Sequence, residues 1–432
     1  MTNVDGTKKD RFGNAIDPTV GYARGKILAS SVEEHARLVH GQRVATARLA
    51  EKGKESISVF TGNQRVFPVR VNMLDLECEE WLGPGLIEHS FQEAALNHVG
   101  GTPGKHTAAL FNRTSGGLVA AVGALSAGKP VVSAVPKASK SHASVSRGCF
   151  AARVDLFESD EVESFKALLA QHHPRLALIT TVSSNLDRIP EASIREMIGL
   201  GQDAGAIVLV DDAYGARMRP ILHGGQHALE MGADLVITNC DKAGMIGPRA
   251  GLLVGVGSCV QRVAAKAAEF GMEARAPIVA AVEQSLRLFD PAHLREEAEM
   301  GKKLTSLFEE QYGREVVHHS DLGPIVLEED LFEIVARRAN ASTDSIDLVP
   351  SEVSSALGVI LLRDHGVLTT NTHGQPGAKV SLRLRPTPEG VKRLGGLPQL
   401  VQALEHSVDH VASLVRNRNA ISNLIIGRDI QQ

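Results

Sequence analysis

Short apolar runs alternate along the chain with longer segments in which apolar residues recur at helical spacing. The runs are PVVSAV (130–135), RLALITTV (175–182), AIVLVDD (206–212), DLVITN (234–239) and AGLLVGV (250–256). Helix-length segments such as EASIREMIGLGQDAG separate them. Continuous Val, Ile and Leu runs spaced in this way are typical of a mostly parallel sheet that helices cover on both faces. The pattern therefore predicts an α/β domain.

The two ends of the chain have a different texture. Residues 30–53 begin with a serine cap, carry apolar residues at helical spacing and close on Gly53, which predicts a helix. From residue 289 onward the sequence predicts a long charged helix, strands in GPIVLEE, VILLRDHGVLTTN and AKVSLRLRP, and a closing helix. We therefore expect an N-terminal helical segment (1–70), a large domain (71–285) and a small α+β domain (286–432).

Composition narrows the class of protein. The chain of 432 residues is 43% hydrophobic and 22% charged, with a net charge of −4, so it lacks the basic excess of a protein built mainly to bind nucleic acid. Four separated cysteines indicate reduced thiols and no zinc site, and the His-His pairs at 172–173 and 318–319 have no third ligand at useful spacing. A polar N-terminus and the lack of a long apolar run predict a cytoplasmic protein with no membrane segment.

One stretch has the composition of an anion site. FNRTSGGLVAAVGAL places Thr114, Ser115, Gly116 and Gly117 directly ahead of an apolar helix. Backbone N–H groups, hydroxyls and the positive end of the helix dipole would converge there on a phosphate. A plain helix cap is the alternative, and neither the GxxxxGK[ST] nor the GxGxxG spacing is present.

Two further strand ends carry charge. The run ending at Asp211 and Asp212 needs a cationic partner, because a buried carboxylate without one is costly. A protonated pyridine nitrogen would serve; alternatively, one aspartate caps a turn and the other pairs with Arg217 or Arg219. Lys242 follows the next run, where the choice lies between a surface turn and an amine whose pKa is lowered in a pocket.

In combination these motifs resemble a known family. FNRTSGG, VDDAYGARMR, GADLVITNCDKAGMIGPRAGLLVG, FGMEARAP and GQPGAKVSLRLRP look like a pyridoxal-phosphate family known from archaeal proteins, itself related to bacterial L-seryl-tRNA(Sec) selenium transferase. The resemblance covers roughly residues 105–385. It implies the aspartate-aminotransferase-like architecture, fold type I, with pyridoxal 5′-phosphate as cofactor.

The resemblance also implies roles for single residues. Lys242 would form the Schiff base with the cofactor, and Asp211, which opens an Asp-x-Ala arrangement, would hold the pyridine nitrogen. The phosphate would be held by Thr114, Ser115 and Gly116, with help from Asn239. His142 falls where related enzymes stack a ring over the cofactor, although a surface histidine is the alternative. Asn185 would bond the phenolic oxygen of the cofactor, or simply occupy a turn.

The same resemblance points to residues for substrate and partner. Arg383 corresponds to the arginine that grips an amino-acid carboxylate, and Arg385, two residues on along the same strand face, competes for that role. Arg249 would meet the substrate or a neighbouring subunit, or brace its loop, and Arg113 is a further candidate for substrate binding. Because sites of this fold generally lie at a dimer interface, we expect at least a homodimer.

For the reaction, the resemblance favours a lyase or transferase that acts on a small amino-acid-like substrate. Selenocysteine synthases remove a β-substituent, so α,β-elimination or β-replacement through an external aldimine, with Lys242 as the base, is the first hypothesis. Three alternatives stay open: selenium transfer to seryl-tRNA, a racemase or aldolase, and a non-catalytic protein that binds the cofactor. The acidic balance of the chain argues against tRNA without excluding it.

Overall fold

The computed structural model describes residues 8–64 and 66–429 and divides the chain into two units. A central unit comprises Asn63–Arg295, and a terminal unit combines Met1–Gly62 with Glu296–Gln432. The breaks fall near the predicted boundaries at 70/71 and 285/286. The N-terminal segment, however, shares one unit with the C-terminal domain instead of forming a segment of its own.

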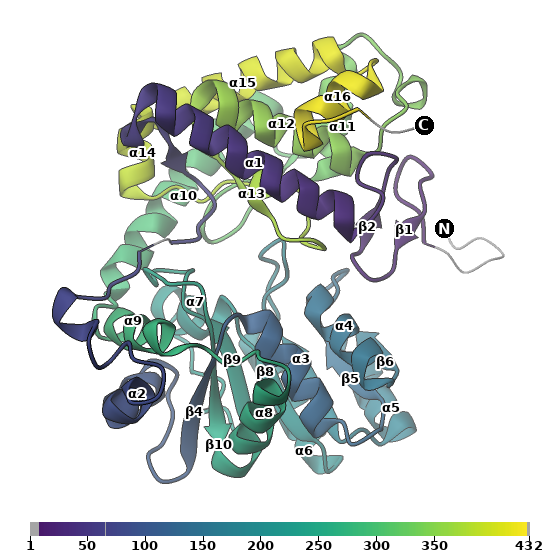
Figure 1. Ribbon diagram of the computed structural model, residues 1–432. Helices are drawn as coiled ribbons and strands as arrows, with labels where there is room; N and C mark the ends of the chain where they lie inside the picture. Colours follow the sequence, from purple (N-terminus) through teal and green to yellow (C-terminus); the bar gives the residue numbers. More distant parts are fainter. Residues whose placement is uncertain (1–7, 65, 430–432) are drawn as a thin grey trace. The chain divides into compact units, whose positions relative to one another are not determined.

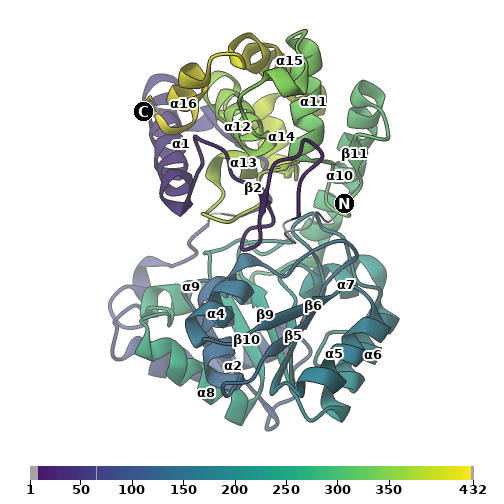
Figure 2. The ribbon, with the colours of Figure 1, turned by 90° about the vertical axis from the view of Figure 1, so that its right-hand side faces the viewer.

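A seven-stranded sheet forms the centre of the central unit (Figures 1 and 2), in the order β4-β10-β9-β8-β7-β5-β6. All pairings from β9 to β6 are parallel, whereas β10 runs antiparallel to both β4 and β9. The strands are β4 (His106–Phe111), β5 (Val131–Ala134), β6 (Leu156–Ser159), β7 (Leu176–Thr180), β8 (Ile207–Asp211), β9 (Leu235–Asn239) and β10 (Gly251–Val256).

Each predicted strand of this region is present, shortened by one to three residues. Every residue of β7 and β9 is buried, which explains why these strands are apolar throughout and do not alternate. The sequence did not predict β4 and β6, because their runs are rich in alanine or mixed with polar residues. The mostly parallel α/β sheet is thus confirmed.

Helices cover both faces of the sheet. One face packs against α3, α4 and α8, and the other against a second set that includes α2, α5, α6 and α9. The helices of this unit are α2 (Gly83–His98), α3 (Thr114–Leu125), α4 (Ala143–Ala152), α5 (Val162–His172), α6 (Glu191–Asp203), α7 (Gly215–His223), α8 (Gly257–Glu269) and α9 (Ala276–Arg287), with a 3-10 turn η2 (Val71–Met73). We call these the α3 face and the α2 face of the sheet.

The terminal unit has one core built by α11, α12, α15 and α16 together with Phe60 and Leu382. The predicted helix after the serine cap is α1 (Ser31–Lys52), where the Ser30 hydroxyl accepts from the N–H of Val32 at 3.0 Å. Further elements are α10 (Pro291–Tyr312), which begins in the central unit, α11 (Glu328–Arg338), α12 (Pro350–His365), α13 (Thr370–His373), α14 (Pro388–Leu394), α15 (Leu397–Leu414), α16 (Arg418–Ile426), η1 (Lys54–Ser56) and η3 (Thr343–Ser345).

The strands of this unit are short. They are β1 (Ile16–Asp17), β2 (Tyr22–Ala23), β3 (Ser58–Val59), β11 (Val317–His318), β12 (Ile325–Val326), β13 (Val367–Leu368) and β14 (Leu382–Arg383).

One strand prediction in this unit is wrong. Residues 359–365, expected to be extended, form the end of α12. This helix is buried on all sides from Pro350 to Leu362, so its sequence shows no polar face that would reveal helical periodicity. Only β13 remains of the strand predicted there.

Candidate active site

The candidate residues gather on the α3 face of the sheet, at the carboxyl ends of its parallel strands. Leu209, Ile237, Leu253 and Phe111 belong to the core cluster on this face, whereas Val210 belongs to the cluster on the α2 face. Because side chains alternate along a strand, Asp211 continues the row of Leu209 on the α3 face, and Asp212 points to the α2 face. Two adjacent aspartates therefore enter different environments.

Asp212 has a cation of its own. Its carboxylate binds Arg219 through Nη2–Oδ2 at 2.6 Å and Nη1–Oδ1 at 3.2 Å, and the Thr181 hydroxyl donates to Oδ1. All three side chains are buried. The pairing proposed for one of the two aspartates therefore involves Asp212 and Arg219, and it leaves Asp211 available.

Asp211 is buried, with 5% of its surface exposed, and among the described residues none forms a hydrogen bond to its Oδ1. The pKa of this carboxyl is raised to about 7, first by burial and then by the Asp212 charge, while Lys242 and a backbone hydrogen bond at Ala213 oppose the shift. A buried carboxyl oxygen without a donor fits a protonated ring nitrogen, which would supply both the missing proton donor and the missing positive charge.

Lys242 comes three residues after the end of β9. Its ammonium lies 5.0 Å from the centroid of the buried Tyr214 ring, a cation–π arrangement, and its side chain is half-buried. Since its charge lowers the pKa of Asp211, the two groups are neighbours electrostatically. The position is thus not that of a lysine on an exposed turn.

Helix α3 begins at the same edge of the sheet. Thr114, Ser115 and Gly116 form its first turn, and no side chain caps the helix at Arg113. The first N–H groups of a helix have no partner within it, so this turn offers donors and a positive dipole end to an anion. A Cβ on Gly251 would lie 2.4 Å from the Thr114 nitrogen, so the start of β10 touches this turn and holds it in place.

Asn239, predicted to help to hold the phosphate, forms hydrogen bonds within the protein through both ends of its amide. Its Nδ2 donates to the Ala213 carbonyl at 2.8 Å, and its Oδ1 accepts from Arg217 at 3.0 Å. Arg217 also donates to the Ala213 carbonyl at 3.0 Å. Both ends of the Asn239 amide thus brace the backbone that follows the two aspartates. A direct phosphate contact of Asn239 stays a prediction that these bonds do not support.

Arg217 is the residue that sequence reasoning missed. It is fully buried, burial lowers the pKa of its guanidinium to about 10, and its Nη1 lies 3.3 Å from His98 Nε2. From the sequence, Arg217 was expected only as a possible ion-pair partner of one of the two aspartates. The presence of two basic residues in AYGARMR was a signal, but the contact of Arg217 with His98 joins positions too far apart in the chain to be inferred.

His142 and Asn185 lie in loops that follow strands. His142 is exposed as the N-cap of α4, where its Nδ1 accepts from the N–H of Ser144 at 3.2 Å and bonds the Ser144 hydroxyl at 2.7 Å. Asn185 is half-buried, and its N–H donates to the Ser183 hydroxyl at 3.1 Å. Stacking over the cofactor by His142 and a bond from Asn185 to it remain predictions.

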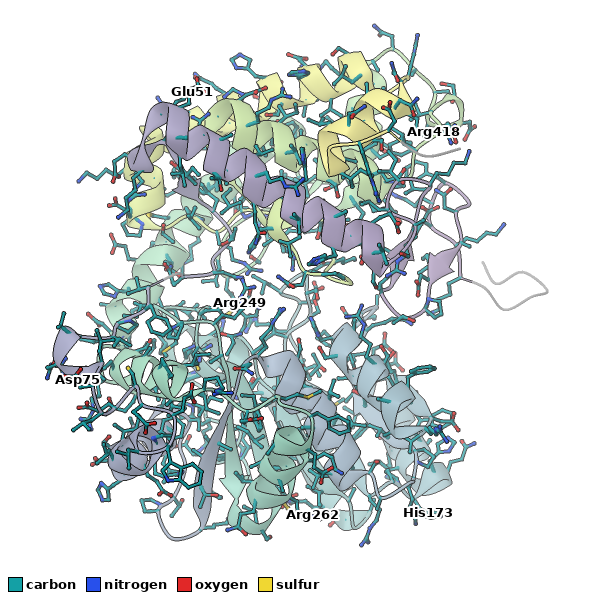
Figure 3. The ribbon with its side chains drawn as sticks, in the orientation of Figure 1. Glu51, Asp75, His173, Arg249, Arg262 and Arg418 are labelled. Atoms are coloured by element: carbon teal, nitrogen blue, oxygen red, sulfur yellow. The ribbon has the colours of Figure 1, made fainter. Side chains whose placement is uncertain are left out.

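Arg249 lies at the end of the central unit where the strands of the α3 face end (Figure 3). Its Nε donates to Asp241 at 3.0 Å, and Asp241 directly precedes Lys242 in the chain. The guanidinium charge of Arg249 also lowers the pKa of Arg113, after the larger effect of burial. Both arginines therefore adjoin the segment that carries the lysine.

Arg383 and Arg385 belong to the terminal unit. Leu382 and Leu384 point into its core, so the two arginines share the opposite side of the segment, and both are more than nine-tenths buried. Arg383 Nη2 donates to the Lys379 carbonyl at 2.8 Å, and the N–H of Arg385 donates to the Phe60 carbonyl at 3.0 Å. Carboxylate binding by either arginine stays a prediction.

In residues 8–64 and 66–429, no three His, Cys, Asp or Glu side chains gather as metal ligands. Every helix in these ranges falls short of the length and apolarity that crossing a bilayer requires.

Known proteins resemble both the sequence and the fold, although no family model matches the chain. It is 31% identical over 405 residues to a UPF0425 pyridoxal phosphate-dependent protein of Methanothermobacter thermautotrophicus, covering 93% of this chain and 100% of that protein. A UPF0425 pyridoxal phosphate-dependent protein of Methanococcus maripaludis is 30% identical over 356 residues, covering 82% and 93%.

Solved structures share the fold at low sequence identity. Alanine–glyoxylate aminotransferase from Nostoc matches with a TM-score of 0.57 and 15% identity, over 81% of this chain and 95% of that one. SepCysS in complex with the SepCysE N-terminal domain matches at 0.57 and 12%, over 85% and 98%. Serine palmitoyltransferase from S. paucimobilis matches at 0.52 and 17%, over 86% and 84%. The predicted fold class and cofactor are confirmed: the chain belongs to the UPF0425 family of pyridoxal phosphate-dependent proteins and has the aminotransferase-like fold type I.

Proposed function

We propose that this protein is an enzyme that binds pyridoxal phosphate at Lys242 and catalyses α,β-elimination or β-replacement on an amino acid. The observation that carries the proposal is the buried Asp211 carboxyl, whose Oδ1 has no hydrogen-bond donor among the described residues. It lies on the sheet face from which α3 begins, and Lys242 follows the neighbouring strand β9.

These residues divide the work of holding the coenzyme. Lys242 would hold its aldehyde, Asp211 its ring nitrogen, and the first turn of α3 its phosphate. When bound, pyridoxal phosphate stabilises the negative charge that develops at Cα of an amino acid. Asp211 supports this by keeping a proton on the ring nitrogen.

Lys242 is also the group proposed to move the proton. Lys242 lies three residues after the end of β9, and its charge acts on the Asp211 carboxyl, so the same amine would accept the proton from Cα once it is released from the coenzyme. A substituent at Cβ would then leave with its bonding electrons. The choice of elimination rests on the resemblance to selenocysteine synthases, which remove a β-substituent.

A first experiment tests the attachment of the coenzyme. The wild-type protein should show a visible absorption band, and borohydride reduction should fix the coenzyme on the peptide that contains Lys242. The Lys242→Ala variant should lose both signals. Lys166→Ala, which alters an exposed lysine on α5, should keep both. A wild-type protein that stays colourless after incubation with pyridoxal phosphate would contradict the proposal.

A second experiment tests the reaction. D- and L-amino acids, amino sugar acids included, are screened for release of ammonia and a keto acid, with chiral chromatography of the remaining substrate. Release of both products supports elimination, whereas a change of chirality alone identifies a racemase. A gel-shift assay with seryl-tRNA at defined salt tests the selenium-transfer alternative. A coenzyme band that responds to no amino acid would identify a non-catalytic binding protein.

A homodimer is also part of the proposal. Eight large apolar side chains between residues 66 and 86 are about half exposed or more, with Trp81 at 88%, whereas Met73 is buried. Exposed apolar patches of this kind mark interaction sites on proteins. The exposed residues are Val66, Phe67, Val71, Leu74, Leu76, Trp81, Leu82 and Leu86; we call this set the 66–86 surface.

A further inference from the structure

Three charged residues, Arg113, Asp241 and Arg249, form a row where three neighbouring strands, β4, β9 and β10, end or begin. In the pairing of β10, Gly251 faces Phe111 of β4 on one side and Asn239 of β9 on the other. Beyond this pair, the N–H of Cys240 bonds the Ala250 carbonyl at 3.2 Å, so Arg249 lies next to Asp241. A Cβ on Gly251 would lie 2.6 Å from the carbonyl carbon of Arg113, so the backbone of Arg113 crosses the start of β10. The Arg249–Asp241 ion pair and the electrostatic effect of Arg249 on Arg113 agree with this placement.

The charges in this row do not balance. Asp241 is buried and binds Arg249 through Nε at 3.0 Å, which compensates one guanidinium. Burial lowers the pKa of Arg113 and the Asp241 charge opposes this shift, but throughout residues 8–64 and 66–429 no carboxylate lies within ion-pair distance of Arg113 and no acceptor bonds its guanidinium. One positive charge therefore remains in a half-buried position, where an arginine ordinarily has an anionic partner.

The location of the row favours a substrate over the coenzyme as the source of that anion. The first turn of α3 already offers the coenzyme phosphate backbone N–H groups and hydroxyls. The arginine pair instead adjoins Asp241, the residue directly before Lys242 in the chain. A planar guanidinium fork suits a carboxylate or a phosphate equally well.

We propose that Arg113 and Arg249 form an anion-binding pair for the substrate side chain, so that the amino acid carries a phosphate or carboxylate group in addition to its α-carboxylate. This inference rests on the proposed function, because it concerns the substrate of the same site. It extends that function by naming the chemical class of the side chain.

The test titrates the coenzyme-loaded enzyme with O-phosphoserine, aspartate and serine and follows the visible absorption band. Wild-type protein should bind O-phosphoserine or aspartate at least about tenfold more tightly than serine, the size expected for a charge-assisted hydrogen bond. Preference for one of the two identifies the anion as phosphate or carboxylate. In Arg113→Gln the preference should fall below about threefold, with serine binding unchanged.

Two control variants accompany it. Arg113→Lys, which keeps the charge but loses the fork, should retain part of the preference. Arg262→Gln removes an exposed arginine on α8 that donates to the Ala124 carbonyl, at the end of the central unit opposite Arg249 in Figure 3, and should bind all three ligands as wild type does.

Other outcomes overturn the inference in distinguishable ways. If Arg113→Gln weakens the binding of all three ligands equally, the arginine pair binds the α-carboxylate that they share. Loss of affinity for pyridoxal phosphate but not for pyridoxal would assign it to the coenzyme phosphate.

A second readout does not depend on any reaction. Inorganic phosphate should raise the Tm of the loaded wild-type enzyme and leave that of Arg113→Gln unchanged. If the band responds to no amino acid, the proposed function fails, and the phosphate measurement still decides the anion site: wild-type protein with no phosphate-dependent rise in Tm would refute it.

Discussion

Asp211 and Asp212 show how one residue type acquires two roles from its place on a strand. Alternation along β8 sends Asp212 to Arg219 and Thr181, which satisfy its charge, and sends Asp211 to the α3 face, where its Oδ1 has no donor among the described residues. The carboxylate of Asp212 is compensated by its partners, whereas burial of the Asp211 carboxylate costs free energy until a cation binds it. The cost of burying Asp211 is the reason why we propose it as the partner of a cationic ring.

This cost leads to a prediction for the coenzyme-free protein. Burial raises the pKa of folded Asp211 from 3.8 to about 7, so between these values the folded state holds a proton that the unfolded state has lost. The free energy of unfolding should therefore fall as pH rises from about 4 to about 7, by up to about 4 kcal/mol from this residue. Asp211→Asn should lack this fall, as measured by urea unfolding across that pH range.

The control is Asp203→Asn, at an exposed position at the end of α6. Its unfolding profile should run parallel to that of wild type. If the free energy of unfolding of Asp211→Asn falls with rising pH as much as that of wild type does, another group titrates in this pH range.

At this scale the sequence predicted residues that belong to local patterns. Lys242, Asp211 and the Thr114–Gly116 turn were identified because each follows a strand or opens a helix, and the structure brings these positions to one edge of the sheet. The bracing of the Ala213 carbonyl by Arg217 and Asn239 was not predicted, since it depends on side-chain contacts between distant segments.

Helix α3 depends on close approach to the sheet. A Cβ on Gly117 would lie 2.6 Å from Ile237 Cδ1 and 2.7 Å from Phe111 Cδ2, which is too close without displacement of the helix or the strands. The absence of a side chain here therefore sets how near the first turn of α3 comes to β4 and β9. That distance in turn fixes the proposed phosphate site.

Gly117→Ala should consequently destabilise the protein by about 1–3 kcal/mol, the usual cost of overpacking a core, and weaken coenzyme binding. Gly123→Ala on the same helix meets no more than the Lys266 side chain at 3.6 Å. It should be neutral or more stable by up to about 1 kcal/mol, because alanine favours helix. Thermal unfolding and coenzyme titration of both variants measure this, and equal effects would show that contact with the sheet does not decide the outcome.

Helix α12 illustrates a limit of pattern reading at the level of elements. The sequence predicted its last turns as a strand because a buried helix and a buried strand both present unbroken apolar residues. Helix α1, by contrast, was predicted with its serine cap and closing glycine, since half of its surface is polar and its ends carry local signals. For these two helices, prediction succeeded where one face is exposed and failed where burial on all sides removed the polar face.

For the molecule as a whole, the division of the chain was the part least accessible from sequence. Glu352 of α12 accepts from the N–H groups of Ile27 at 2.6 Å and Leu28 at 3.1 Å, and a Cβ on Gly25 would overlap its carboxylate. The fully buried Arg37 donates to the carbonyls of Asn371 and Gly374. These bonds join the two ends of the chain in the terminal unit, and no local pattern announces them.

The last prediction concerns assembly. The 66–86 surface concentrates exposed apolar side chains in one stretch before and within α2, whereas Phe150 on α4, at 87% exposed, stands apart from it in the chain. In Figure 3 the label of Asp75 marks this stretch at the margin of the central unit. A second copy of the chain would remove these side chains from water at about 25 cal/mol per Å² of apolar surface.

A charge in the middle of such an interface must be desolvated without a partner. Trp81→Glu should therefore shift the protein from dimer to monomer in sedimentation-velocity experiments. Its monomer should still unfold cooperatively in urea, because Trp81 is exposed within one chain. Phe150→Glu places the same charge at an equally exposed aromatic position and should sediment as wild type. Unchanged sedimentation of Trp81→Glu, or dissociation by Phe150→Glu alone, would place the interface elsewhere; loss of the coenzyme band on dissociation would indicate that the active site depends on the partner.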